Sequence, residues 1–255
     1  MNITGLILTY NEEANLSRTL AKLTWLPRVV IVDSGSDDGT KEIAKGFANI
    51  SWYEREFDNH TNQWNYGLQD TEINTEWVLA LDADYQISEE LASEIQQVIS
   101  QNPSENAFWM KFDYAIDGVT LKSGIYPPVR ALYRKNFAKY TDDGHTQKLQ
   151  ITGETGDLKQ KAIHDDRKSM KRWLTSQWNY ASLEAGKLLA SSKSTLSRQD
   201  KIRIRSKITP IIVFFYCILI RSGWKDGLKG WQYAWQRMIA EVLLQYRLSQ
   251  ERSKN

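Results

Sequence analysis

The 255-residue chain contains a single cysteine, Cys217, and only three histidines. One cysteine excludes a disulfide within the chain and fits a reducing compartment. Three histidines without a cluster of cysteines argue against a structural zinc site. The first residues lack the basic start and the cleavage site of a secretory signal, so we expect a cytoplasmic protein.

No glycine-rich phosphate loop follows the first predicted strand, which is followed instead by Thr-Tyr-Asn-Glu-Glu at residues 9–13. Neither Gly-x-Gly-x-x-Gly nor Gly-Lys-Ser/Thr is present there, which excludes a Rossmann dinucleotide site and a P-loop. Any bound phosphates must therefore be held by a metal ion on carboxylates. That combination suits a nucleotide-diphosphate ligand whose leaving-group charge a cation offsets.

The chain also lacks an apolar run long enough to cross a bilayer. Residues 208–220 are apolar apart from Thr209 and Pro210, but a membrane-spanning helix needs about 20 apolar residues. From residue 224 to residue 246, tryptophan, leucine and other apolar residues recur at helical spacing, and the opposite side of that predicted helix carries lysine and arginine. Basic residues beside a tryptophan-rich apolar face are typical of a helix that lies in the membrane interface.

The small net charge of +2 hides a strong asymmetry, because residues 1–160 carry a net charge of −10 and residues 161–255 a net charge of +12. A basic region beside an acidic body predicts an anionic partner, either a membrane or a nucleic acid. No nucleic-acid recognition motif accompanies the charge, so we expect no nucleic-acid partner. We predict a peripheral contact with an anionic membrane through residues 198–248, at the inner face of the cytoplasmic membrane. The alternatives are that the same apolar stripe covers the core or forms a dimer.

Strand and helix signals alternate through the first hundred residues, which predicts an α/β fold with a mostly parallel sheet flanked by helices. Apolar strands are expected at 3–8, 29–32, 50–53 and 77–81, with helices at 12–23, 40–47, 62–69 and 88–100. Three segments are expected: a ligand-binding α/β half at 1–105, a second half of the same domain at 106–167, and a basic, aromatic helical extension at 168–255.

The sequence Asp82-Ala83-Asp84 directly follows the apolar run at residues 77–81. A strand that is apolar at nearly every position is usually buried on both faces, and open α/β sheets bind ligands at the carboxyl ends of such strands. Two carboxylates at that position suit Mg²⁺ or Mn²⁺, which usually also holds substrate phosphates. The alternative is an acidic turn without a ligand.

Two earlier strands end in polar residues as well, with Thr9, Asn11 and Glu12 after the first and Asp33 and Ser34 after the second. Because parallel neighbours place their carboxyl ends along one edge, these residues and Asp82 are expected to line one crevice.

Three motifs in order, residues 8–13, 32–40 and 79–84, resemble those of the family-2 glycosyltransferases. The resemblance covers about residues 1–165, and the segments around Pro27 and Trp64 are similar to the branch that includes lipopolysaccharide-core β-glucosyltransferases. It implies a GT-A fold and an inverting transfer from a nucleotide sugar.

Carried over position by position, the resemblance implies roles for individual residues. Asp84 is the expected metal ligand, with Asp82 touching the ribose or a metal-bound water and His164 completing the site. Arg130 is expected to meet a phosphate or an acceptor anion. The residues expected along the nucleotide sugar are Thr9, Asn11, Glu12, Asp33, Ser34, Gln63, Asn65, Asp82 and Arg130.

The general base must take a proton from the acceptor hydroxyl as its oxygen attacks the anomeric carbon. Related enzymes often have His-Glu where this chain has Asp142, Asp143, Gly144, His145 and Thr146, and Thr146 stands in place of that glutamate. We therefore predict Asp143 as the base, with Asp142 and His145 as rivals.

These patterns predict a metal-dependent, inverting glycosyltransferase that moves a hexose from a UDP-sugar to a cell-envelope glycan or a lipid-linked acceptor. Two alternatives remain: a nucleotidyltransferase, and a scaffold with the same fold that binds glycan or membrane without turnover.

Overall fold

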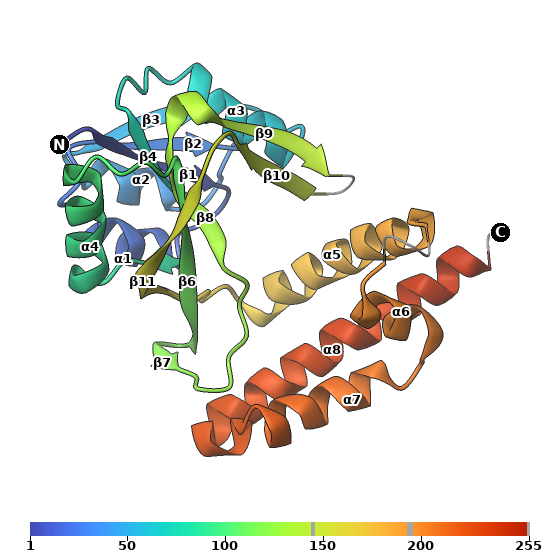
Figure 1. Cartoon of the computed structure of the whole chain (residues 1–255). Helices are drawn as coiled ribbons and strands as arrows, with labels where there is room; N and C mark the ends of the chain where they lie inside the picture. The colour runs from blue at the N-terminus through green and yellow to red at the C-terminus, as the bar shows by residue number, and fades with distance from the viewer. Residues whose placement is uncertain (144–145, 193–195, 254–255) are drawn as a thin grey trace. The chain divides into compact units, whose positions relative to one another are not determined.

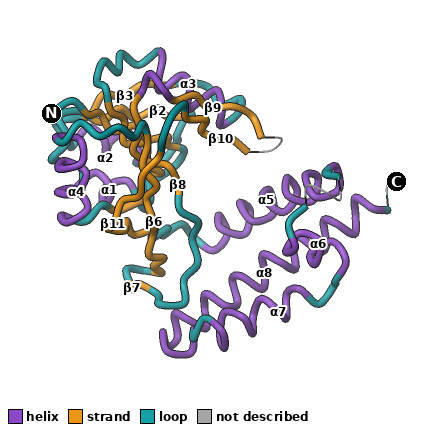
Figure 2. The backbone as a smooth tube through the Cα atoms, in the orientation of Figure 1, coloured by secondary structure: helices purple, strands orange, loops and turns teal. Residues whose placement is uncertain are grey.

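The computed structural model describes residues 1–143, 146–192 and 196–253. It divides the chain into two compact units (Figures 1 and 2). The sheet unit comprises Met1–Gly118 and Ile125–Arg167, and the helical unit comprises Val119–Gly124 and the chain from Lys168 onward. The predicted α/β fold with a helical C-terminal region is confirmed.

Four strands from the start of the chain form the parallel half of the sheet, in the order β3-β2-β1-β4. They are β1 (Ile3–Thr9), β2 (Val29–Asp33), β3 (Ile50–Glu54) and β4 (Trp77–Asp82). Every residue of β2 is buried, and in β1 and β4 only Leu8 and Asp82 are not. Their nearly continuous apolar sequences arise because both faces of these strands are covered by protein.

Helices cover one face of this sheet through α1 (Leu16–Ala21), α2 (Thr40–Lys45) and α4 (Glu89–Ser100). Leu16, Leu20, Leu91 and Ile95 from these helices share one core with Ile7 of β1. The other face is covered by α3 (His60–Gln69), whose Trp64 and Leu68 share a second core with Leu6. The alternation of side chains along β1 thus feeds two separate apolar layers.

The sheet continues beyond β4 through strands from the second half of the unit. These are β8 (Val129–Arg134), β6 (Ala107–Ile116), β11 (Thr155–His164) and β5 (Tyr85–Gln86), in that order. β8 is antiparallel to both β4 and β6, β11 is parallel to β6, and β5 is antiparallel to β11. The sheet is therefore mixed, with its parallel part where the motifs lie.

A separate antiparallel hairpin packs on α3, beside which it lies in Figure 1. It consists of β9 (Ala138–Asp143) and β10 (Thr146–Ile151) and follows the short 3₁₀ turn η1 (Lys135–Phe137). The rings of Trp64 and Tyr140 stack with their centroids 5.3 Å apart. This stack fixes the base of the hairpin to the sheet unit.

The helical unit is built around two long helices, α5 (Met170–Ala190) and α8 (Gly227–Arg252). Ala185 and Leu188 of α5 share a small core with Leu244 and Leu248 of α8. The remaining elements are β7 (Val119–Thr120), α6 (Arg198–Arg205), α7 (Thr209–Phe215), the π-helical turn η2 (Tyr216–Ile220) and the 3₁₀ turn η3 (Gly223–Asp226). Within the described part of the chain, no helix combines the length and apolar character needed to span a membrane.

Two predicted helices are shorter in the structure than the sequence pattern suggests. The helix expected at 12–23 runs only from Leu16 to Ala21. Before it, the carbonyl of Glu12 accepts hydrogen bonds from the N–H groups of Asn15 and Leu16, which closes a turn. The helix expected at 40–47 ends at Lys45. The hydroxyl of Thr40, the first residue of this helix, accepts a hydrogen bond from the backbone N–H of Glu12.

Gly67 allows α3 to pack closely on β1, which yields a stability prediction. A Cβ at Gly67 would lie 2.7 Å from Cδ1 of Leu6, whose side chain is fully buried. We expect Gly67→Val to lower the free energy of unfolding by about 1–3 kcal/mol through overpacking. Urea denaturation measures this change. The control is Gln69→Val on the exposed side of the same helix; an equal loss in both variants would contradict the packing argument.

Candidate active site

The strand register brings the three sequence motifs to one edge of the sheet. Thr9 at the end of β1 lies beside Asp33 at the end of β2, and Leu8 lies beside Asp82 at the end of β4. The carboxyl ends of β1, β2 and β4 therefore meet as the sequence predicts.

Asp33 organises the loop that follows β2. Its Oδ1 accepts hydrogen bonds from the hydroxyls of Thr9 and Ser36, at 2.7 and 2.6 Å, and its Oδ2 accepts from the backbone N–H of Gly35 and Ser36, at 3.0 and 2.7 Å. Both carboxylate oxygens of this buried residue are thus engaged. Asp33 therefore fixes the loop after β2 to the end of β1. Its predicted contact with the nucleotide stays a prediction.

The turn after β1 is fixed to the same loop. Asn11 adopts a left-handed backbone with φ of 55°, a conformation that asparagine tolerates better than most residues. Its N–H donates to the Ser36 hydroxyl at 2.7 Å, and its Oδ1 accepts from the N–H of Asp37 at 2.8 Å. The N–H of Glu12 donates to the Thr40 hydroxyl at 2.7 Å. Asn11 and Glu12 therefore lie at the edge where the sequence places the nucleotide.

Gln63 links α3 to the loops after β2 and β3. Its buried amide donates from Nε2 to the Ser34 hydroxyl at 2.9 Å and accepts at Oε1 from Arg55 at 2.7 Å. Arg55 also forms two hydrogen bonds with Asp58, one to each carboxylate oxygen. These bonds, with a further one from Asn62, hold the pKa of Asp58 well below its usual range.

Asp84 and His164 are brought together although they are far apart in the sequence. The antiparallel pairing of β5 with β11 sets His164 opposite Tyr85, the neighbour of Asp84. Nε2 of His164 lies 3.4 Å from Oδ2 of Asp84, and both side chains are largely buried. Asp82, the first residue of the motif, is exposed at the end of β4. Two of the three predicted metal ligands, Asp84 and His164, are thus in contact in the structure.

Aromatic rings surround this pair. The His164 ring stacks on Tyr126 and on Tyr114, with centroids 4.3 and 5.1 Å apart, and the hydroxyls of Tyr85 and Tyr126 lie 2.7 Å apart. Burial raises the pKa of Tyr85, and the nearby charge of Asp82 raises it further, so its hydroxyl stays protonated. The imidazole therefore has a fixed orientation beside Asp84.

Two residues predicted along the sugar diphosphate fasten the hairpin instead. Asn65 forms a pair of hydrogen bonds with the backbone of Tyr140, one as donor at 2.9 Å and one as acceptor at 3.1 Å. Arg130 donates to the carbonyl of Leu149 and lies over the Trp109 ring. Their predicted contacts with substrate remain predictions, whereas their structural contacts fix β9 and β10.

The candidate base residues lie at the end of this hairpin. Asp142 is exposed on β9, and the backbone of Asp143 closes the strand opposite Thr146. The side chain of Asp143 and the whole of His145 lie outside the described residues.

Sequence reasoning missed a polar network, the α1 clamp, formed by Asn15, Arg18 and Asp165. Asp165 is buried and accepts from Arg18 and from Arg167, while its N–H donates to the carbonyl of Asp84 at 3.2 Å. Asn15 is fully buried and donates to Glu12 at 3.0 Å. The adjacency of Asp165 to His164 was the one signal in the sequence that pointed here.

The cationic side chains near this edge are already engaged. In the described residues Arg18 meets Asp165, Arg55 meets Asp58, and Arg130 meets a backbone carbonyl. Burial lowers the pKa of Arg18, and Asp165 partly offsets this effect. In the part of the chain that the structure describes, these three arginines already have partners, so a bound cation would add charge compensation for an anionic diphosphate beside Asp82 and Asp84.

These side chains suit a divalent cation that takes some of its ligands from the protein and the others from a substrate. Among the described residues, no three His, Cys, Asp or Glu side chains gather into a complete metal cluster. Asp84 and His164 offer an oxygen and a nitrogen, and Mg²⁺ or Mn²⁺ commonly combines one or two carboxylates with substrate phosphates. The Asp84–His164 pair is thus suited to a metal site whose remaining ligands are phosphate oxygens of a bound substrate.

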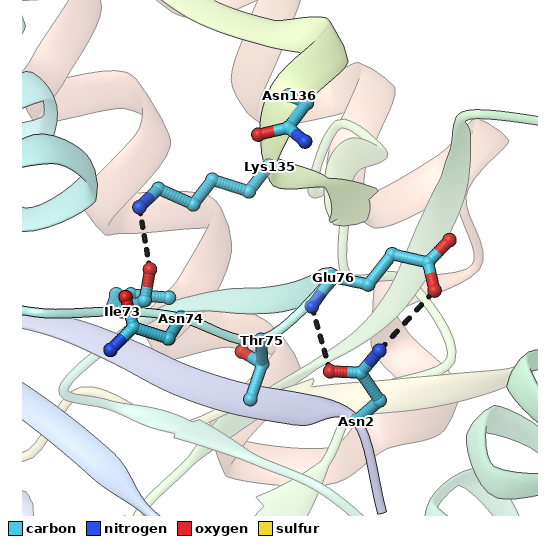
Figure 3. A pocket seen from close by; sticks show the side chains of 7 residues that line it. All are labelled: Asn2, Ile73, Asn74, Thr75, Glu76, Lys135 and Asn136. Carbon is cyan, nitrogen blue, oxygen red and sulfur yellow. Dashed lines mark hydrogen bonds between the residues drawn. The ribbon is translucent and has the colours of Figure 1, made fainter.

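A hollow of about 350 Å³ lies beside the amino-terminal ends of β1 and β4 (Figure 3). Asn2 before β1 and Glu76 before β4 bond to each other there, and Lys135 donates to the carbonyl of Ile73. These contacts join the amino-terminal ends of the strands. The hollow is structural and is separate from the site at the carboxyl ends.

Alignments with curated relatives cover more than half of this chain. It is 22% identical over 242 residues to the lipopolysaccharide core biosynthesis glycosyltransferase LpsC of Rhizobium meliloti (strain 1021), which covers 89% of this chain and 84% of LpsC. It is 27% identical over 146 residues to the uncharacterized glycosyltransferase RT0209 of Rickettsia typhi, covering 55% of this chain and 49% of that protein.

Solved structures of S. aureus TarS 1–349 are similar along the whole chain. The complex with UDP has a TM-score of 0.54 at 14% identity and covers 100% of this chain and 92% of that one. The complex with UDP-GlcNAc has a TM-score of 0.52 at 16% identity, with 100% and 93% covered. At this level of identity the likeness concerns the fold, and it confirms the GT-A-like architecture.

A family model described as Glycosyl transferase family 2 matches residues 6–159. This range is more than half of the chain and contains the ends of β1, β2 and β4, where the motifs converge. The chain belongs to glycosyl transferase family 2.

Proposed function

We propose that the protein is an inverting glycosyltransferase that moves a hexose from a UDP-sugar to a hydroxyl of a cell-envelope glycan or lipid-linked acceptor. The observation that carries this proposal is the buried Asp84–His164 pair at the carboxyl edge of a family-2 sheet. The crystallisation of TarS with UDP and with UDP-GlcNAc supports a UDP-sugar donor. The name of LpsC, a lipopolysaccharide core enzyme, supports a cell-envelope acceptor.

Asp84 and His164 would hold Mg²⁺ or Mn²⁺, with Asp82 beside them at the end of β4. When bound, the metal would offset negative charge on the diphosphate leaving group. Thr9, Asn11, Glu12 and Ser34 would border the nucleotide. The rings of Tyr114 and Tyr126 keep the imidazole in one orientation.

Sugar transfer exchanges one bond for another at the anomeric carbon. The acceptor oxygen forms a bond to that carbon on the face opposite the diphosphate, and the bond to the diphosphate oxygen breaks, which releases UDP. An aspartate at the end of β9 takes the proton of the acceptor hydroxyl. We assign this role to Asp143, with Asp142 and His145 as the alternatives. Because Asn65 and Trp64 fasten β9 to α3, the base is carried on a fixed support.

The α1 clamp and the neighbouring Thr19 hold the backbone beside Asp84 and His164, the two proposed metal ligands. The N–H of Asp165 donates to the carbonyl of Asp84, and the Thr19 hydroxyl donates to the carbonyl of Ala83 at 2.6 Å. His164 directly precedes Asp165, so the same contacts place both predicted ligands. Residues that orient metal ligands typically change metal affinity by about 10- to 100-fold when they are replaced.

We further propose that the reaction takes place at the inner face of the cytoplasmic membrane. Residues 168–255 carry 17 Lys and Arg against 5 Asp and Glu, and such a charge attracts an anionic lipid surface. Residues 198–248 would make the peripheral contact.

Replacing Asp84 tests the metal assignment. We expect Asp84→Asn to lower UDP-sugar turnover with Mn²⁺ by about 100-fold or more, because the metal stabilises the leaving group by several kcal/mol. UDP binding in the presence of Mn²⁺, measured by calorimetry, should weaken as well. The matched control is Asp37→Asn, which removes an exposed carboxylate from the neighbouring loop. Equal turnover in the wild type and Asp84→Asn would reject the assignment, and no turnover in the wild type would favour the scaffold.

Replacing each candidate base separately tests the proton acceptor. We expect Asp143→Asn to lower kcat by about 10²- to 10⁴-fold, the usual contribution of a general base. The affinity for UDP should be unchanged, because the base does not touch the nucleotide. Asp142→Asn and His145→Ala are the comparison variants. A large loss of kcat in either of these, with normal turnover in Asp143→Asn, would reassign the role.

Removing the carboxylate of Asp165 tests the clamp. We expect Asp165→Ala to lower the free energy of unfolding by about 3 kcal/mol, because Arg18 and Arg167 lose their shared partner. The control is Glu54→Ala, which breaks the exposed pair with Lys41 and should lower the stability much less, because water and salt screen such a pair. Chemical denaturation measures both. Similar losses in the two variants would show that the clamp is no more than a surface ion pair.

A further inference from the structure

The long helix α8 leaves an apolar side uncovered. Leu228, Trp231, Trp235, Val242 and Tyr246 are all exposed, and Leu228 exposes 88% of its surface. Their spacing of three, four and seven residues places them along one side of the helix. The core contacts of the same helix use other positions, Tyr233, Ala234, Leu244 and Leu248 among them. A helix in a water-soluble unit normally turns polar residues outward, so this exposed side calls for a partner.

The segment before α8 extends the same surface. Ile211 and Phe215 of α7 are exposed, as are Leu219 and Ile220 of η2, with Ile220 at 72%. Phe214 contacts the rings of Trp231 and Trp235, with centroids 6.0 and 4.9 Å apart. These contacts join α7 and α8 into one surface, which we call the apolar face. Contiguous exposed apolar patches of this kind mark interaction sites.

Basic side chains border the apolar face in the sequence and in the helical unit. Arg205 and Lys207 are exposed directly before α7, and Arg221 and Lys225 are exposed between η2 and α8. Nζ of Lys225 lies 5.2 Å from the centre of the Trp224 ring, which is itself exposed. Indole rings and long basic side chains are the residues that favour the boundary between lipid tails and headgroups.

We propose that the apolar face docks on an anionic lipid bilayer, with the side chains of η2 and the first turns of α8 among the headgroups. The helices would lie in the interface, where apolar faces enter about 5–10 Å into the lipid. A second copy of the chain is a poorer occupant, because residues 168–255 carry a net charge of +12 and would face the same charge across the contact. This inference rests on the membrane contact proposed above and specifies the residues that make it. The docking itself does not require sugar transfer.

Vesicle sedimentation tests the docking. Full-length protein is mixed without sugar donor with vesicles of phosphatidylcholine and phosphatidylglycerol, or of phosphatidylcholine alone. We expect binding to the anionic vesicles at low salt and weaker binding at high salt. Ile220→Glu should weaken the binding by about tenfold or more, because an apolar contact becomes a charge of the same sign as the lipid. Phe137→Glu, at an exposed apolar position of the sheet unit, should bind like the wild type.

A second variant tests the basic residues that border the apolar face. Removing both charges in Arg205→Ala/Lys207→Ala should weaken the binding roughly 30-fold, since each basic residue near an anionic surface contributes about fivefold. Binding of Ile220→Glu and of this double variant at the wild-type level would overturn the proposal. Failure of the wild type to sediment at low salt, together with dimer formation in analytical ultracentrifugation that Ile220→Glu abolishes, would assign the face to a second copy and also overturn it.

A spin label gives a second readout that does not depend on the effect of a substitution on folding. Cys217 is buried and is the one cysteine of the chain, so Leu228→Cys offers a selective labelling site. On anionic vesicles, we expect the label to become more accessible to oxygen and less accessible to a water-soluble nickel reagent. A label at Phe137→Cys should not change. An unchanged label at position 228 on bound vesicles would show that another surface docks. UDP-sugar turnover in solution, measured in parallel, separates a failure of docking from a failure of the proposed activity.

Discussion

The parallel register of β1 between β2 and β4 is the constraint on which the site depends. Because β1 is hydrogen-bonded on both sides and buried on both faces, its position fixes where its two neighbours end. A slip of one residue would exchange Leu6 and Ile7 between two different apolar layers. The burial of these side chains therefore sets, at the other end of the strands, the separation of Thr9, Asp33 and Asp82.

Electrostatics gives this edge its chemical character. Nearby arginines are matched with carboxylates or carbonyls, and Asp33 is satisfied by four hydrogen bonds, so these groups define shape more than they attract an anion. Asp82, Asp84 and His164 are the residues to which we assign the proposed cation, and Nε2 of His164 lies 3.4 Å from Oδ2 of Asp84. The proposed site would bind a diphosphate together with a metal ion, which differs in principle from a glycine-rich loop that holds phosphates with backbone N–H groups.

The two units divide opposite physical properties between them. The sheet unit buries its apolar strands almost completely and has an acidic sequence, whereas the helical unit is basic and exposes tryptophan, isoleucine and leucine on α7, η2 and α8. The proposed chemistry on a nucleotide sugar and the proposed attachment to a lipid surface would call for these different properties. In this chain the acidic, fully packed strands and the basic, exposed apolar helices lie in different segments.

The sequence by itself determined the strands, the polar residues at their ends and the charge asymmetry, because continuous apolar runs and local motifs are properties of neighbouring residues. The family resemblance also assigned Asp84 and His164 to one metal site, although nothing in the spacing of these residues shows that they meet. Their pairing was decided by the tertiary structure, since only the register of β5 with β11 brings them together. The same holds for the long-range partners of Asn15 and Asp165 in the α1 clamp and for the contact of Asn65 with the hairpin, which join residues 75 to 152 positions apart. Local patterns carry no information on such distances in the chain, because these contacts form only when the whole sheet closes and buries their polar groups together.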